Sequence, residues 1–249
     1  MYKKHPYLIE PENLNQKIWR YMDFTKFISL LLRKSLFFCR VDKLGDQNEM
    51  SLPLANRKKN IEFFNRNKEI IEKSFKGKLT LELWNNILDF TRRSIIINSW
   101  NCSDYESAAM WSTYLRTNQG IAIQSSFNRL CESFNKTNYS IHIGLINYKD
   151  YKHDLIQENT IFGYVSHKLK SYEHEKELRA IITNQVDEKL YPLHETGKYI
   201  PINLEVLIES IYIAPNAPRW FNELVVDIMK KFNLDIPIKT SELNDRSLY

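Results

Sequence analysis

Three charged residues, Glu175, Glu177 and Arg179, form the group in this sequence that is best suited to chemistry. They alternate with other residues over 175–183, and the apolar continuation of this stretch predicts a β-strand that runs inward. Since the side chains of a strand alternate between its faces, these three are expected to share one face. Two adjacent carboxylates and an arginine can hold a ribose hydroxyl or accept a proton. A solvated strand face with opposite charges is the alternative interpretation.

A second candidate group combines aromatic rings with hydroxyl side chains. Trp111 and Tyr114 are three residues apart on an expected helix, so both rings lie on one face, where they can stack a planar ligand or pack in the core. Ser125 and Ser126 end an expected strand and can form the polar wall of a cleft. These four residues are therefore candidates for binding a cofactor.

Motifs for several other chemistries are missing from the sequence. It has no P-loop, no Gly-x-Gly-x-x-Gly fingerprint, no His-Glu-x-x-His, no paired-cysteine zinc pattern and no Gly-x-Ser-x-Gly elbow. His167 and His174 are seven residues apart around an expected helix end, where a capping or surface role is favoured. ATP-driven, metallopeptidase and hydrolase activities are therefore disfavoured, and no metal site is expected.

The composition indicates one compact cytoplasmic domain over 1–249. The chain is 43% apolar and 26% charged, and its 6 Gly and 8 Pro leave little sequence for flexible linkers. Its 14 Tyr, 13 Phe and 5 Trp exceed the usual need of a core, which indicates that some rings face a ligand. Three widely spaced cysteines favour a reducing compartment, and no window approaches the roughly twenty apolar residues of a membrane span.

The net charge of +5 comes from one part of the chain. The segment 33–93 contains 14 Lys and Arg against 8 Asp and Glu, an excess of six. Such an excess of basic residues can bind along a phosphate backbone, although the solvated faces of surface helices give the same pattern.

The expected elements alternate irregularly, which is typical of an α+β fold. A strand, a helix and a strand open the chain, and the helical periodicity over 54–93 predicts an insert in a split β core. Further strands are expected over 95–100, 120–126, 141–148, 175–183, 199–202, 208–214 and 236–239, and helices over 106–116, 127–134, 160–170 and 219–232.

Several motifs, taken in order, resemble a known family. They are Trp19-Arg-Tyr, Leu36-Phe-Phe-Cys-Arg-Val, Met110-Trp-Ser-x-Tyr, Gly120-Ile-Ala-Ile, His174-Glu-Lys-Glu-Leu-Arg and Ile211-Tyr-Ile-Ala-Pro. Together they resemble a large bacterial family of domains of unknown function that often occurs near phage-defence genes. The resemblance covers nearly the whole chain and implies no activity by itself.

A more distant resemblance implies chemistry. Ile18-Trp-Arg-Tyr-Met-Asp resembles the first motif of ADP-ribosyltransferase-like domains, where a strand carries an Arg or His that holds NAD. Such domains then place a polar strand and a Glu-x-Glu, in the order seen here. The resemblance implies a split sheet of that type and NAD as the substrate, with Glu177 at the nicotinamide ribose, Glu175 at the acceptor nucleophile and Arg20 at the phosphates. It also implies Ser125 or Ser126 as the residue of the polar strand. Apart from the resemblance, Arg179 is a third candidate catalytic residue with the two glutamates, and Tyr21, Trp111 and Tyr114 join Ser125 and Ser126 as candidates for binding the cofactor.

The sequence therefore predicts an NAD-dependent ADP-ribosyltransferase that acts as a toxin or anti-phage effector on nucleic acid or protein, with an antitoxin as a possible partner. Transfer of ADP-ribose requires a carboxylate near the anomeric carbon and an aromatic wall for nicotinamide, and no metal. Two alternatives remain open. One is a nuclease that uses the acidic group with a divalent ion, and the other is a non-catalytic module that binds a ligand in the aromatic cleft.

Overall fold

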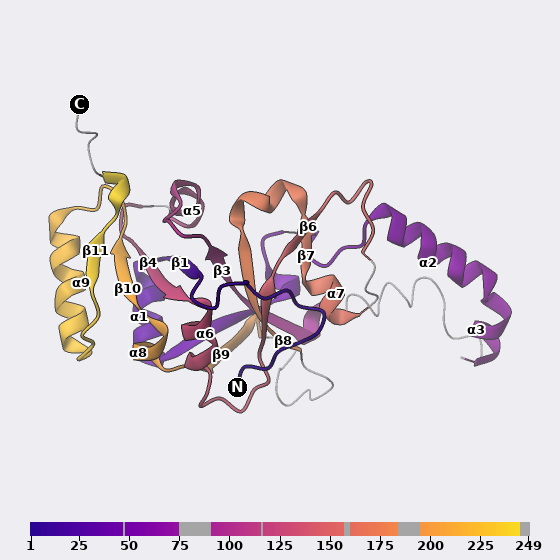
Figure 1. Ribbon diagram of the computed structural model, residues 1–249, viewed down its shortest axis with the longest axis horizontal. Coiled ribbons are helices and arrows are strands. Elements are labelled where there is room, and N and C mark those ends of the chain that lie inside the picture. Colours follow the sequence, from indigo (N-terminus) through magenta and orange to yellow (C-terminus); the bar gives the residue numbers. More distant parts are fainter. Residues whose placement is uncertain (47, 75–90, 116, 157–159, 184–194, 245–249) are drawn as a thin grey trace.

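A large, mostly antiparallel sheet forms the centre of the computed structural model, which describes residues 1–46, 48–74, 91–115, 117–156, 160–183 and 195–244. In this part of the chain the sheet has nine strands, in the order β11-β10-β4-β1-β3-β2-β9, with β8 paired to β3 and β5 paired to β8 (Figure 1). Only β10 and β11 pair in parallel within it. The strands are β1 (Lys17–Asp23), β2 (Ser35–Arg40), β3 (Ile95–Cys102), β4 (Gly120–Ser126), β5 (His142–Leu145), β8 (Glu177–Thr183), β9 (Gly197–Pro201), β10 (Ser210–Ile213) and β11 (Ile238–Thr240).

The sheet is split between β1 and β2. Along one edge β3 pairs with β8 from Ile95 to Asn101. Along its other edge β3 pairs with β2 at Ile96 and Ile97, and with β1 at Asn101 and Cys102. The three residues between these pairings face neither strand, so the sheet is open there.

Helices cover both faces of the sheet. On one face lie α1 (Phe24–Arg33), α6 (Phe127–Ser133), α8 (Leu204–Leu207) and α9 (Arg219–Lys231), which contribute to the main apolar core. The other face is covered by α5 (Ala108–Tyr114) and α7 (Ile161–Val165), each over a smaller apolar cluster. This arrangement places α1 and α5 over opposite faces of the sheet at the split.

Helix α1 connects β1 to β2 and so fixes the two strands that border the split. Asp23 begins the helix because its carboxylate accepts the backbone N–H of Lys26 at 2.8 Å. Phe27, Leu30 and Leu31 are buried on its inner face, and Lys34 ends it in the left-handed conformation with φ of 46°.

Two helices, α2 (Leu54–Arg66) and α3 (Lys68–Ser74), extend away from the sheet at the right of Figure 1. Asn56 anchors the first of them, because its amide exchanges two hydrogen bonds with the backbone of Ile156. Residues 75–90 of the expected insert over 54–93 lie outside the described residues. Exposed basic side chains follow α2 and the start of α3, at Arg57, Lys58, Lys59, Arg66 and Lys68.

The structure corrects three expected elements. The helix expected over 160–170 ends at Val165, and β7 (His167–Leu169) follows and pairs in parallel with β6 (Asn147–Lys149). That pairing also divides the strand expected over 141–148 into β5 and β6. The third correction concerns β8, which begins at Glu177 and not at 175. Before it, the 3₁₀ helix η2 (Lys170–Glu175) closes with Lys176 at a φ of 41°, so the extended backbone begins only afterwards.

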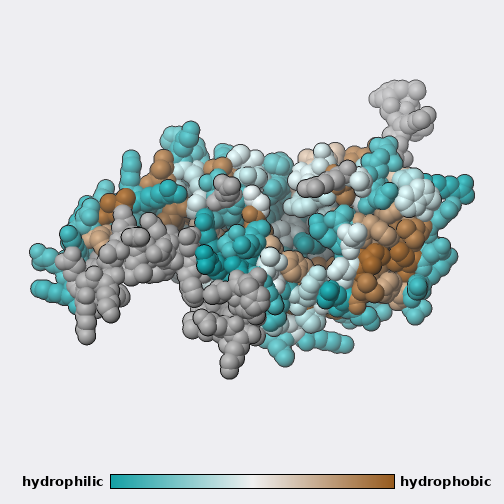
Figure 2. Space-filling view, turned by 180° about the vertical axis from the view of Figure 1, so that it is seen from behind, coloured by the Kyte–Doolittle hydropathy of each residue, from teal (hydrophilic) through white to brown (hydrophobic). Residues whose placement is uncertain are grey.

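The face that carries α9 leaves apolar side chains in contact with solvent. Figure 2 shows an apolar area on the α9 side of the molecule, surrounded by hydrophilic side chains. In α1 and α9 the exposed apolar residues include Leu32, Trp220 and Leu224. Among the described residues, no helix combines the length and the apolar character that crossing a membrane requires.

Candidate active site

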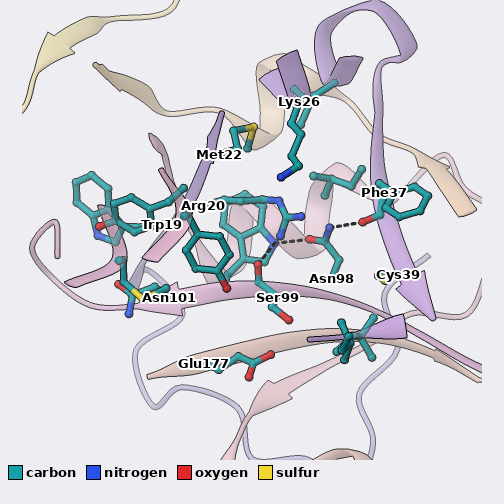
Figure 3. Close-up of a pocket in the computed structure, with 18 of the residues that line it drawn as sticks. Trp19, Arg20, Met22, Lys26, Phe37, Cys39, Asn98, Ser99, Asn101 and Glu177 are labelled. Carbon is teal, nitrogen blue, oxygen red and sulfur yellow. Dashed lines mark hydrogen bonds between the residues drawn. The ribbon is translucent and has the colours of Figure 1, made fainter. Parts of the chain in front are cut away.

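A pocket of about 370 Å³ lies in the split of the sheet (Figure 3). Its walls come from β1, β2, β3, β9, α1 and α5, together with the carboxylates of Glu175, at the end of η2, and of Glu177, at the start of β8. It forms there because Asn98, Ser99 and Trp100 of β3 have no neighbouring strand on that side. A volume of this size holds a ligand of several rings.

One side of the pocket carries positive charge. Arg20 of β1 donates a hydrogen bond to the carbonyl oxygen of Ser99 across the split, and its guanidinium lies over the ring of Trp100 at 5.9 Å from the centroid. Lys26 extends from α1 toward Arg20 (Figure 3). Burial lowers the pKa of Arg20, although a guanidinium keeps its proton in proteins. Two cations therefore line the pocket here, of which Lys26 is also paired with Asp23 at 2.9 Å.

Glu177 supplies a buried negative charge to the same pocket. Burial by itself would raise the pKa of its carboxyl, but Arg179 and Lys168 more than offset this and hold that pKa at about 2. The carboxylate accepts from Nε of Arg179 at 2.6 Å and from Nη2 at 3.0 Å. Glu177 is consequently ionised at neutral pH while only 5% of its surface is exposed.

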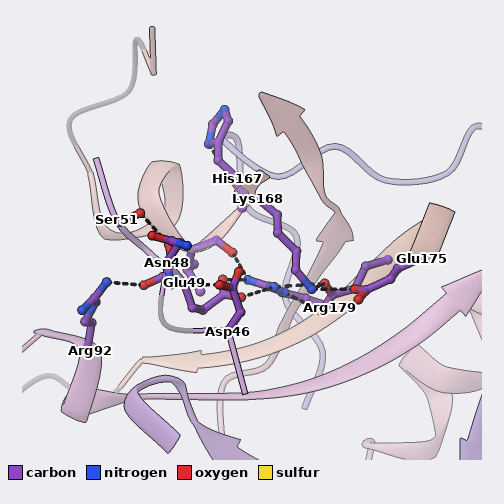
Figure 4. Close-up of polar contacts among 12 residues, drawn as sticks. Asp46, Asn48, Glu49, Ser51, Arg92, His167, Lys168, Glu175 and Arg179 are labelled. Carbon is purple, nitrogen blue, oxygen red and sulfur yellow. Dashed lines mark hydrogen bonds and ion pairs between the residues drawn. The ribbon is translucent and has the colours of Figure 1, made fainter. Parts of the chain in front are cut away.

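Arg179 uses all of its donors inside the protein (Figure 4). Two nitrogens bind Glu177, two bind the carboxylate of Glu49 at 2.6 and 2.9 Å, and Nη1 also donates to the carbonyl oxygen of Val165 at 2.9 Å. These contacts account for the five N–H groups of a guanidinium. Arg179 is 1% exposed and does not line the pocket, so it holds Glu177 in place and has no donor left for a ligand.

Lys168 connects Glu177 to the second carboxylate of the pocket, Glu175. Its Nζ lies 2.6 Å from Oε2 of Glu175 and 3.4 Å from Oε2 of Glu177. Burial opposes the charge of Lys168, but the two carboxylates raise its pKa above the usual value. The group of Glu49, Glu175, Glu177, Lys168 and Arg179 has three negative and two positive charges. Its excess negative charge faces the pocket, because Glu175 and Glu177 are the members that line it.

The aromatic residues Trp111 and Tyr114, predicted to face one ligand, have different surroundings in the structure. Tyr114 lines the pocket and is 43% exposed, and burial together with Glu175 and Glu177 raises its pKa. Trp111 lies outside the pocket, in the core, where its Nε1 donates to Glu106 at 2.7 Å. Tyr21 borders the pocket, but its hydroxyl accepts the backbone N–H of Ser107 and its ring packs edge-on against Trp111.

Ser125 and Ser126 lie away from the pocket. Ser125 is fully buried and donates to the carbonyl oxygen of Leu207 at 2.5 Å. Ser126 begins α6, where its hydroxyl accepts the backbone N–H of Arg129 at 3.3 Å. The prediction that these two serines form the wall of a cleft is therefore wrong. All of β4 is buried, and both hydroxyls have partners within the fold.

Several residues of the site were not identified from the sequence. Glu49 and Lys168 reach the group from other segments, and Tyr199 reaches the pocket from β9. No local pattern marks them, because only the fold brings them to the glutamates. Within the described ranges, no three His, Cys, Asp or Glu side chains gather so that they could hold a metal ion.

No family model and no curated protein matches the sequence, so the resemblance to a bacterial family of unknown function stays a prediction. Two solved structures of DarT from Thermus sp. 2.9 are similar to this chain. The complex with carba-NAD+ is 10% identical with a TM-score of 0.38, covering 94% of this chain and 98% of that one. The complex with ADP-ribosylated ssDNA is 11% identical with a TM-score of 0.42, covering 95% and 97%. Both scores lie below 0.5, so this similarity carries no argument about the activity of this chain.

Proposed function

We propose that this protein consumes NAD and transfers ADP-ribose to an acceptor nucleic acid or protein. The observation that carries the proposal is the opposite charge of the two sides of the pocket, with Arg20 and Lys26 on one side and Glu175 and Glu177 on the other. NAD has the matching pattern, because its diphosphate is anionic and its nicotinamide ring is cationic. A ligand with one kind of charge would leave one side unmatched.

Glu177 acts on the bond between nicotinamide and the ribose. As this bond breaks, its electron pair moves to the ring nitrogen, neutral nicotinamide leaves, and positive charge develops at the anomeric carbon. An ionised carboxylate in a buried pocket stabilises that charge strongly. Arg179 keeps the carboxylate ionised and oriented, so no proton has to leave before the reaction.

The other pocket residues bind the two partners of the reaction. Arg20 pairs with the diphosphate, and the exposed ring of Tyr114 forms a wall for the departing nicotinamide. The acceptor then attacks the anomeric carbon and loses its proton to the Glu175 carboxylate, which Lys168 holds at 2.6 Å.

Incubation with labelled NAD tests the proposal. The wild type is expected to release nicotinamide without added metal, and Glu177→Gln is expected to lose about a hundredfold or more in rate, because an amide cannot match the developing charge. Glu173→Gln is the matched control, because Glu173 is exposed in η2 and does not line the pocket. Full NAD turnover by Glu177→Gln would contradict the proposal.

Two further arms separate the alternatives. Cleavage of nucleic acid that a chelator abolishes would favour the nuclease, and NAD binding without turnover would favour a binding module. A role as a toxin or defence effector with an antitoxin predicts that expression of the wild type arrests growth, whereas Glu177→Gln does not.

A further inference from the structure

Helices α1 and α9, which lie on the same face of the sheet, each leave a row of apolar side chains in contact with solvent (Figure 2). We propose that these two rows dock an amphipathic helix of another protein, with acidic residues beside its apolar face. The proposal names a partner and goes beyond the proposed reaction. The rows are called the helix-docking surface below, and they consist of Phe24, Ile28, Leu32, Trp220, Leu224 and Ile228.

On α1 the apolar side chains of this surface recur at every fourth position. Phe24, Ile28 and Leu32 therefore follow one face of the helix. The first two pack partly against the main core, whereas Leu32 is 67% exposed. Lys26 and Ser29, which line the pocket, point to a different face, since the helix turns once in 3.6 residues. A partner that covers the apolar row thus leaves the pocket open.

Helix α9 repeats the same spacing, and aromatic rings join its row to that of α1. Trp220 is 52% exposed and Leu224 37%, and Ile228 continues their row one turn further. The buried ring of Phe221 packs edge-on against Phe24 at 5.1 Å between centroids and against Trp220 at 5.9 Å. The two rows therefore form one apolar surface, and each extends about 12 Å along its helix. An exposed apolar surface with polar residues around it is typical of an interaction site.

The charges of the two helices leave an excess of positive charge beside this surface. Every acidic residue of α1, α9 and their capping residues is already paired, in the ion pairs Asp23–Lys26 at 2.9 Å, Glu223–Arg219 at 2.9 Å and Asp227–Lys230 at 3.8 Å. Arg33, Lys34 and Lys231, by contrast, have no carboxylate partner among the described residues. Lys231 lies seven residues after Leu224 and so on the same face of α9. Carboxylates on the flank of a docked helix would match these cations.

A second copy of this chain or a lipid bilayer matches the helix-docking surface less well. A two-fold dimer uses the same surface twice, so it would bring the unpaired cations of both copies together. A flat bilayer would also have to cover the exposed carboxylates of Glu223 and Asp227 on α9. A single helix contacts the apolar rows alone and can place its acidic side chains beside Lys231.

Tryptophan fluorescence tests the docking, because Trp220 is half-exposed whereas Trp19, Trp100 and Trp111 are buried. The probe is a helical peptide of about 18 residues, or about five turns, that has a row of leucines flanked by glutamates and no tryptophan. Its binding is expected to shift the emission to shorter wavelength as the Trp220 ring leaves water. Trp220→Phe is expected to remove this shift.

Substitutions of exposed leucines locate the binding site. Leu224→Glu is expected to weaken binding of the glutamate peptide at least about tenfold, because it removes an apolar contact and adds a like charge. Leu32→Glu on α1 is expected to do the same, and it keeps the test valid if Leu224→Glu fails to fold, because Leu32 is the more exposed of the two. Leu54→Glu is the matched control on α2, where the leucine is exposed and lies away from both rows.

The charge of the partner is tested separately. A peptide with lysines in place of the glutamates is expected to bind the wild type at least about tenfold more weakly. Lys231→Gln is expected to weaken binding of the glutamate peptide about three- to tenfold at low salt, and less at high salt. Lys58→Gln removes the same charge from an exposed position on α2 and is expected to change binding less than about twofold.

Four results would overturn the proposal. Equal binding of the two peptides would show that charge does not select the partner, and unchanged binding by both Leu224→Glu and Leu32→Glu would place the peptide elsewhere. Light scattering that shows a dimer, lost in Leu32→Glu, would assign the surface to a second copy. A fluorescence shift of Trp220 with phosphatidylcholine vesicles would assign it to lipid. All of these measurements are made without NAD, so a failure of the proposed reaction is seen separately.

Discussion

Acid is expected to weaken the fold through Glu177 in particular. The pKa of this carboxyl falls from 4.5 in a free chain to about 2 in the folded protein, because Arg179 and Lys168 outweigh its burial. A pKa that is depressed on folding adds stability above its unfolded value, and this stability is lost as the pH falls toward the folded value. The difference corresponds to about 3 kcal/mol, of which about 2 kcal/mol is lost between about pH 7 and about pH 3.

Urea unfolding followed by tryptophan fluorescence measures this loss. The free energy of unfolding of Glu177→Gln is expected to fall by about 2 kcal/mol less than that of the wild type over the same pH range, since an amide does not titrate. Glu173→Gln is the control and is expected to follow the wild-type curve, because this residue is exposed. Parallel curves for the wild type and Glu177→Gln would show that the ion pairs do not keep Glu177 charged, and the reasoning about the site would fail.

Two further substitutions test how the site is supported. Gly197→Ala is expected to cost about 1–3 kcal/mol in a denaturant titration, because a Cβ there would lie 2.1 Å from the carbonyl oxygen of Phe38 in the paired strand, whereas Gly45→Ala meets nothing within 4 Å and serves as the control. Ser126→Ala is expected to cost about 1 kcal/mol through the lost cap at Arg129, with NAD turnover unchanged; a selective loss of turnover would restore this residue to the cofactor site.

Local patterns predicted the part of the site that one strand carries. Glu177 and Arg179 do share a face, because both lie on β8, where alternation applies. Glu175 reaches the pocket by a different route, since it ends a 3₁₀ turn and Lys168 holds its carboxylate. Alternation alone could not show this, because the positive φ of Lys176 is a property of the folded turn.

Contacts between segments that are far apart in the chain could not be predicted from the sequence. Glu49 lies 130 residues from Arg179 along the chain, and no motif joins the two. The prediction that Ser125 and Ser126 line a cleft was wrong for a related reason. The end of a strand can form the wall of a cleft only if no other element covers it, and helices cover both sides of β4. Helix α1 and the two strands around it could be predicted, since capping and hydrophobic periodicity depend only on neighbouring residues.

The pairing of Glu49 with Arg179 also limits how related chains can vary. The carboxylate is 4% exposed and the guanidinium 1%. A chain that loses Arg179 leaves the carboxylates of both Glu49 and Glu177 buried without their shared guanidinium, whereas one that loses Glu49 leaves two donors of Arg179 unpaired while Glu177 still matches its charge. Relatives that change position 179 are therefore expected to change position 49 as well, so the two positions should appear as linked substitutions in an alignment even though they are far apart in the chain.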